Sequence, residues 1–394
     1  MAGGVKTSSA NAASRWFKPS SDYDDPQAYT RFANVPPTRG PTANNNKATA
    51  DSSKTAITPT ESEMKRGRWH RFLESVAVGI YVFGFAFAPF VLTAAALTVL
   101  FFPPLWIFAF PYMIWCVYDW KTPKRGSRSW KPFRELSLWR YMASYFPMKI
   151  IKTASLPPDR NYIVGAHPHG ILSFSTFLTF CTEACGFNVL FPGLERRFAV
   201  TLAVQYWFPI RRELLLFTNT ISSEVSAIEH VLQMSDKGTV VALVPGGAAE
   251  ALDSSPDCYR LTLKNRKGFI KVALQNGAAL VPSYSFGETS AFKQISNPEG
   301  SRLREFQNVF KRFTGVTTPF FYGCGFLSNR FGFLPFRTPI NLVIGRPIEV
   351  QKKMEPTITE INDLHDKYCR ELNSLFEEYK QKYGVPPEAK LEFV

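Results

Sequence analysis

The chain has 394 residues, of which 45% are hydrophobic and 15% aromatic, so it can form one large domain or two small ones with a sizeable core. Its formal net charge of +14 indicates an anionic partner such as nucleic acid, lipid headgroups or the phosphates of a small molecule. The six cysteines lack the spacing of a zinc site, and the N-terminal region has no apolar run of the kind found in cleaved signal peptides.

The first 64 residues are rich in Ser, Thr, Asn, Ala and Pro and contain few aliphatic side chains. Such a segment buries too little apolar surface to offset the entropy lost on ordering. We therefore predict a disordered N-terminal tail over residues 1–64.

The second segment, 65–120, contains a run without any charged side chain, from 76 to 118. A single helix of this length would extend about 65 Å, roughly twice the thickness of the hydrocarbon layer, so two passes fit better than one. Basic residues flank both ends, which predicts that both ends stay on the cytosolic side. We expect a transmembrane helical hairpin with bends near Pro89 and the Pro103-Pro104 pair. A pair of buried soluble helices is the alternative.

Residues 121–394 alternate short Val-, Ile- and Ala-rich runs with helical patterns. This alternation predicts an α/β catalytic domain with a mostly parallel sheet flanked by helices. The predicted strands span 162–166, 198–204, 239–244, 278–285 and 340–344, and the predicted helices span 172–185, 224–234, 268–276 and 360–383.

The first chemical motif follows the strand 162–166 and reads His167-Pro168-His169-Gly170. Open α/β sheets build their sites at the carboxyl ends of strands, where these imidazoles should lie. A histidine in an apolar setting stays neutral and can accept a proton. Gly170 permits a close approach of substrate, and free amides at the following helix start could stabilise an oxyanion. A structural or metal-binding His pair is the alternative.

The second motif follows the strand 239–244 and places Gly246 and Gly247 before Glu250. If the two strands are neighbours, Glu250 and His169 converge at one sheet edge. Glu250 could then orient the imidazole, as the acid of a catalytic triad does. Otherwise Glu250 is an acid in the first turn of a helix, where the helix dipole favours it.

A third block runs from Arg266 to Glu288 and begins with a basic helix start. Arg266, Lys267 and Lys271 could bind phosphates, or they could form a solvated basic face. The sequence contains no G-x-S-x-G elbow, Walker loop, Rossmann glycine fingerprint or nucleic-acid-binding motif. These absences argue against a serine hydrolase, a nucleotide-driven enzyme and a nucleic-acid partner.

Together these motifs resemble the type-2 diacylglycerol acyltransferase family, which includes monoacylglycerol and wax-ester acyltransferases. The resemblance covers roughly residues 65–394 and rests on 167–170, 245–250, 266–288, the Tyr-Phe-Pro triplet at 145–147 and Gly-Arg-Pro-Ile at 345–348. The family usually carries glycine near Thr218 and Asn219, where this sequence departs from it.

The resemblance implies that His169 is the catalytic base and that Glu250 works with it, with His167 the less constrained of the two histidines. Glu183 also fits the family pattern, and we interpret it as structural or substrate-facing because an unbroken helix would place it about 20 Å from His169. Pro168, Gly170, Gly246, Gly247 and the three basic residues are expected to contact substrate.

The function implied by the resemblance is acyl-CoA:diacylglycerol O-acyltransferase activity by direct transfer, which forms triacylglycerol. Monoacylglycerol and fatty-alcohol acceptors are alternatives, and a non-catalytic lipid-droplet hairpin protein is the alternative of another class. We expect no cofactor or metal, with acyl-CoA as co-substrate, membrane lipids as partners, and the oligomeric state left open. The expected location is the endoplasmic reticulum membrane, extending to lipid droplets, with both termini cytosolic.

Overall fold

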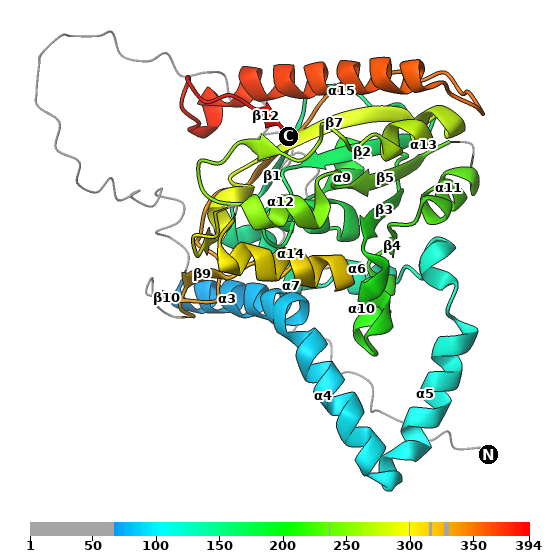
Figure 1. Ribbon diagram of the computed structural model, residues 1–394, viewed down its shortest axis with the longest axis vertical. Helices are drawn as coiled ribbons and strands as arrows, with labels where there is room; N and C mark the ends of the chain where they lie inside the picture. The colour runs from blue at the N-terminus through cyan, green and yellow to red at the C-terminus, as the bar shows by residue number, and fades with distance from the viewer. Residues whose placement is uncertain (1–66, 236, 299, 315–316, 327–330) are drawn as a thin grey trace, which may run out of the picture. The chain divides into compact units, whose positions relative to one another are not determined.

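The computed structural model describes residues 67–235, 237–298, 300–314, 317–326 and 331–394. The tail predicted over residues 1–64 lies outside these ranges. At the centre is a seven-stranded sheet in the order β1-β11-β7-β2-β5-β3-β4 (Figure 1). Its strands are β1 (Lys149–Lys152), β11 (Asn341–Ile344), β7 (Ala279–Phe286), β2 (Tyr162–His167), β5 (Thr239–Leu243), β3 (Arg196–Thr201) and β4 (Thr220–Ser222).

The five strands β7, β2, β5, β3 and β4 are parallel to one another. On the other side of β7, β11 runs antiparallel to it and pairs in parallel with β1. Every residue of β2, β5 and β7 is buried, as expected for central strands covered on both faces. Along β2, Tyr162 and Val164 join one hydrophobic core and Ile163 joins the other. The predicted α/β class with a mostly parallel sheet is therefore confirmed.

Helices cover both faces of this sheet. On one face pack α3 (Arg68–Val82) and α7 (Ser137–Tyr145), and on the other pack the remaining core helices (Figure 1). These are α11 (Val225–Gln233), α13 (Gly268–Asn276) and α15 (Ile358–Tyr379). The last begins at a capping box, in which Thr357 and Glu360 satisfy each other's backbone amides.

The segment predicted as one helix over 172–185 is different. Ser173 has a left-handed backbone, α8 (Phe174–Thr176) is short, and a π-helical turn (Phe177–Cys181) follows it. The chain then leaves the helix because the Glu183 carboxylate is bound by two buried arginines. Side-chain partners distant in sequence thus outweigh the apolar periodicity of this segment.

The apolar run forms a continuation of α3 through a π-helical turn (Phe83–Phe87) into α4 (Ala88–Phe101), then a 3-10 turn (Pro103–Leu105) and α5 (Trp106–Tyr118). Among the residues that the structure describes, one helix, Arg68–Val99, is long and apolar enough to cross a membrane. The first half of that helix packs on the domain, whereas large side chains of α4 and α5 such as Phe90 and Phe108 are exposed. The chain bends at the Pro103-Pro104 pair, as predicted.

An ion pair attaches α3 to the catalytic domain. Glu74 on α3 is buried, and its carboxylate binds the guanidinium of Arg337 and the His70 ring, the latter at 3.3 Å. The same guanidinium lies 4.0 Å from the centre of the Tyr145 ring and donates to Ser75 Oγ at 3.2 Å. Arg337 therefore neutralises a buried charge on α3.

Replacing Arg337 with Met should lower the free energy of unfolding by about 2 kcal/mol, because a buried carboxylate loses the cation that neutralises it. Thermal unfolding of the full chain in detergent micelles would measure this. The matched control is Lys353→Met, which breaks an exposed pair with Glu360 and should cost less than about 0.5 kcal/mol. Equal losses in the two variants would contradict the role of Arg337.

Candidate active site

Two neighbouring strands bring the predicted site together. His167 ends β2 and His169 follows two residues later, while Glu250 lies on α12 (Gly247–Asp253), directly after β5. Because β2 pairs in parallel with β5, both motifs reach the same sheet edge. The backbone N–H of His169 donates to Glu250 Oε2 at 2.7 Å. The predicted convergence of Glu250 and His169 is confirmed.

The contact differs from the one expected. Glu250 accepts from two backbone amides, that of His169 and, through Oε1 at 3.1 Å, that of Thr262. The prediction that Glu250 orients the imidazole ring directly is wrong, because the carboxylate holds the backbone instead. Burial raises the pKa of Glu250 to about 7, and the two amide hydrogen bonds oppose that rise.

The ring of His169 is oriented by a backbone carbonyl. Its Nδ1 lies 3.0 Å from the carbonyl oxygen of Gly170. A carbonyl oxygen can only accept, so Nδ1 carries the proton and Nε2 keeps its lone pair. Burial lowers the pKa of His169, which keeps the ring neutral near pH 7. The neutral tautomer with a basic Nε2 is the form that a general base requires.

A second buried carboxylate, Glu288, holds the other end of the same loop. It follows β7, the strand on the opposite side of β2, and accepts from the amides of Phe174 at 2.7 Å and Ser175 at 3.0 Å. Burial raises the pKa of Glu288 to about 7, against the hydrogen bonds from these amides. Glu250 and Glu288 thus hold the 167–175 loop from both sides, and we call this pair the carboxylate clamp.

Sequence analysis missed the role of Glu288, which it placed only at the end of the basic block. The available signal was its position just after a predicted strand, the same position that singled out His169 and Glu250. What the sequence did not show was that β7 lies next to β2.

The clamp also changes the assignment of oxyanion donors. The amides of Phe174 and Ser175 at the start of α8 donate to Glu288, and the amide of Gly247 donates to the carbonyl of Val244 at 3.1 Å. The prediction that free amides at this helix start stabilise an oxyanion is therefore wrong for these residues. Gly246, which directly precedes α12, is buried.

His167 has surroundings unlike those of His169. It is fully buried, its Nε2 lies 3.0 Å from the Tyr368 hydroxyl on α15, and burial lowers its pKa to about 3. The His167–Pro168 peptide bond is cis. The burial of His167 and its contact with Tyr368 favour a structural role, joining β2 to α15, and its predicted catalytic role receives no support from these contacts.

Of the three basic residues in this block, Arg266 has an electrostatic effect on the site. The charge of Arg266 acts on Glu250, where it lowers the pKa against the larger effect of burial. Arg266 and Lys271 are exposed, whereas Lys267 donates from Nζ to Asn362 Oδ1 at 2.7 Å. Their predicted contact with phosphates stays a prediction.

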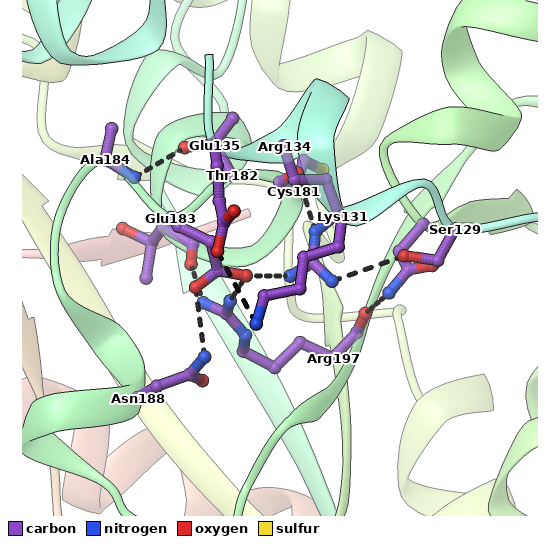
Figure 2. A network of polar contacts seen from close by, with 12 residues as sticks. Ser129, Lys131, Arg134, Glu135, Cys181, Thr182, Glu183, Ala184, Asn188 and Arg197 are labelled. Atoms are coloured by element: carbon purple, nitrogen blue, oxygen red, sulfur yellow. Dashed lines mark hydrogen bonds and ion pairs between the residues drawn. The ribbon is translucent and has the colours of Figure 1, made fainter. Parts of the chain in front are cut away.

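Glu183 lies in a separate buried network (Figure 2). Its Oε1 is 2.6 Å from Arg134 Nη2 and 2.5 Å from Arg197 Nη2, and Oε2 accepts from Asn188 at 3.0 Å. Arg197 comes from β3 and its side chain is fully buried. These contacts support the structural interpretation of Glu183. No group of three or more His, Cys, Asp or Glu side chains within the described ranges is arranged to hold a metal ion.

Comparison with known proteins shows the family. The diacylglycerol acyltransferase family matches residues 98–394 of the chain. The chain belongs to this family. It is 43% identical to 2-acylglycerol O-acyltransferase 1 of Bos taurus over 290 residues, covering 73% of this chain and 86% of that protein. It is 41% identical to diacylglycerol O-acyltransferase 2 of Xenopus laevis over 325 residues, covering 82% and 90%.

The crystal structure of the 1-acyl-sn-glycerophosphate acyltransferase of Thermotoga maritima is 12% identical, with a TM-score of 0.36, covering 78% of this chain and 97% of that one. The expected family resemblance and the expectation of an acyltransferase enzyme are both confirmed by the family match and the relatives. The non-catalytic alternative has no support.

The departure from the family pattern at Asn219 has a backbone explanation. Asn219 has a φ of +60°, in the left-handed region that glycine adopts readily and that asparagine tolerates. Its side chain donates to the carbonyl of Arg197 at 3.0 Å, within a buried turn. Asn219 therefore forms the kind of turn that a glycine would form at this position.

Replacing Gly170 with Ala should reduce kcat at least about tenfold, because an added Cβ would meet Glu288 Cγ at 2.8 Å and push against the clamp. The control is Gly384→Ala, which has a similar backbone (φ +78° against +62°) but nothing within 4 Å of the added Cβ. Acyltransferase assays at saturating substrate would compare them. Equal activity in both variants would show that the Gly170 contact has no part in positioning His169.

Proposed function

We propose that the chain is an acyl-CoA:diacylglycerol O-acyltransferase that transfers the acyl group directly, with His169 as general base. The observation that carries this proposal is the orientation of the His169 ring, whose Nδ1–H donates to Gly170 and leaves Nε2 unprotonated. Family membership supplies the reaction class. The relatives' names supply the acceptor class, an acylglycerol.

In the proposed reaction, His169 Nε2 removes the proton of the acceptor hydroxyl while the oxygen attacks the thioester carbonyl carbon. The carbonyl oxygen becomes an oxyanion, the carbon–sulfur bond breaks, and the thiolate leaves. The imidazolium then gives its proton to the thiolate. Because burial lowers the pKa of His169, this last transfer is favourable and the ring returns to its neutral form. The proposal needs no cofactor, metal or covalent acyl-enzyme.

The backbone amide that stabilises the oxyanion should lie next to the His169 ring. Since the amides of Phe174, Ser175 and Gly247 already donate, we place this role at the amide of Gly170. Its positive φ and the close Glu288 side chain fix the direction of this peptide. We place the phosphates of acyl-CoA near Arg266, because its positive charge acts on Glu250 in the site.

The acceptor is proposed to arrive from the membrane along α3. The Tyr81 hydroxyl on α3 donates to the carbonyl of Leu172 at 2.9 Å, three residues beyond His169. Tyr81 also packs on Phe174 and Phe177, at ring distances of 5.4 and 4.6 Å. The helix that continues into the apolar α4 thus contacts the catalytic loop, which supports entry of a hydrophobic acceptor beside it.

We propose that α4 and α5 form a hairpin that enters the endoplasmic reticulum membrane from the cytosolic side. Arg68 and Arg71 precede it, and Lys121, Lys124 and Arg125 follow it, so both ends are basic. With 13 residues α5 extends about 20 Å, short of the hydrocarbon thickness. A hairpin that turns back within the membrane satisfies both facts, and also suits the monolayer of a lipid droplet.

Two acceptors have specific support. Ala248 and Ala249, partly exposed beside the clamp, offer no cation for a phosphorylated acceptor, which favours diacylglycerol. Monoacylglycerol is the second candidate, because 2-acylglycerol O-acyltransferase 1 of Bos taurus is 43% identical.

Replacing His169 with Ala should lower kcat by at least about 100-fold, the usual contribution of a general base. The control is His230→Ala, an exposed histidine on α11, which should retain activity. In the wild type, kcat should fall only below pH 6.5, because the lowered pKa keeps His169 neutral above that value. Turnover above half the wild-type value in the folded His169→Ala protein would end the base assignment.

Purified protein should acylate diacylglycerol at least about tenfold faster than monoacylglycerol or fatty alcohol, because the side chains of Ala248 and Ala249 beside the clamp give a second acceptor hydroxyl no hydrogen-bond partner. Radiolabelled acyl-CoA with each acceptor in micelles, followed by thin-layer chromatography, gives the rates. A reversed preference would assign the monoacylglycerol reaction, and no product with any acceptor would refute acyl transfer from acyl-CoA.

A further inference from the structure

Residues 207–214 have a polarity opposite to that expected for a surface in water. Trp207, Ile210 and Leu214 are 66%, 58% and 46% exposed, whereas Arg211 and Arg212 between them are only 4% and 2% exposed. Arginines normally lie outside and large apolar side chains inside. An exposed apolar set over a buried charged one is typical of a surface that faces lipid.

The two arginines attach this segment to both ends of the apolar helices. Arg212 binds the carboxylate of Asp119, one residue after α5, at 2.6 Å, and that of Glu213 at 2.9 Å. Arg211 donates to the carbonyls of Gly84 and Phe85, and its guanidinium lies 4.7 Å from the centre of the Phe85 ring. A π-helical turn displaces carbonyls from the usual helical bonds, and Arg211 binds them here.

Ile210 makes a third attachment. Its backbone N–H donates to the Tyr112 hydroxyl on α5 at 2.9 Å. Its φ is positive, at +63°, which is unusual for a β-branched residue and persists only where the surroundings impose it. The contacts on each side of Ile210 therefore hold its side chain outward at the cost of an unfavourable backbone.

We propose that the 207–214 segment is a third membrane contact, which inserts Trp207, Ile210 and Leu214 into the interfacial layer of the bilayer between α4 and α5. The partner is lipid because the segment is bonded to both apolar helices and continues their exposed apolar surface. Trp207 is of the residue type that membrane interfaces favour. A third contact beside the hairpin would define the tilt of the catalytic domain relative to the membrane plane. The proposal rests on the proposed membrane placement of α4 and α5.

The test uses the full chain reconstituted in phosphatidylcholine vesicles, with single added cysteines carrying an environment-sensitive NBD fluorophore. Ile210→Cys reports on the segment. Ile358→Cys, the same residue type and 79% exposed at the start of α15, is the control, and α15 lies on the far side of the sheet from α4 and α5 (Figure 1). Leu97→Cys, 54% exposed on α4, reports on the hairpin. The unsubstituted chain, labelled in parallel, gives the background from the native cysteines.

Lipids with a nitroxide near the headgroup should quench the label at 210 at least about twofold more than the label at 358, with blue-shifted emission at 210. Equal quenching at 210 and 358, with strong quenching at 97, would overturn the proposal and leave the hairpin in the membrane. Absence of quenching at both 97 and 210 would overturn the hairpin placement as well. Iodide added to the aqueous phase gives the second measurement, and it should quench the label at 358 more than the label at 210.

Discussion

Two buried carboxylates hold the backbone that carries His169, the proposed general base. Glu250 and Glu288 come from strands on opposite sides of β2, and each accepts two backbone amides. Burying a carboxylate costs free energy unless it is hydrogen-bonded. The loop amides therefore stabilise the two acids, and the acids in turn fix the loop. The loop in turn presents the Gly170 carbonyl that sets the tautomer of His169. In the proposed mechanism the His169 ring is thus oriented by a carbonyl rather than by an acid, which distinguishes this site from a triad.

The central strands of the sheet could be predicted from the sequence, whereas its edge strands and the role of Glu288 could not. The five predicted strands lie on β2, β3, β5, β7 and β11, because continuous Val- and Ile-rich runs are typical of strands buried on both faces. The edge strands β1 and β4 were missed, since they are short and partly polar. Glu288 could not be assigned to the site, because its role depends on the order of strands in space. The helix expected over 172–185 failed because buried arginines bind Glu183 beyond its true end.

In the parts of the molecule that we propose to face the membrane, the charged side chains point inward and pair with buried partners. Arg211, Arg212, Arg337 and Glu74 are all occupied by partners at the base of the apolar helices. These contacts leave α4, α5 and the 207–214 segment to present apolar side chains outward. The net charge of +14 for the whole chain therefore does not mean that the surface around α4 and α5 is strongly basic, because several arginines there are buried.

The helix Arg68–Val99 has 32 residues and bends at its π-helical turn, so that α3 lies along the α/β domain while the apolar α4 points away from it (Figure 1). Its contact with the catalytic loop, Tyr81, lies just before the π-helical turn that separates these halves. The turn is therefore the joint between the arm packed on the domain and the apolar arm. Under the proposed membrane placement of α4, a change in the angle of the apolar arm would reach the 167–175 loop through this joint and Tyr81, so the thickness of the lipid layer would become a variable of the reaction.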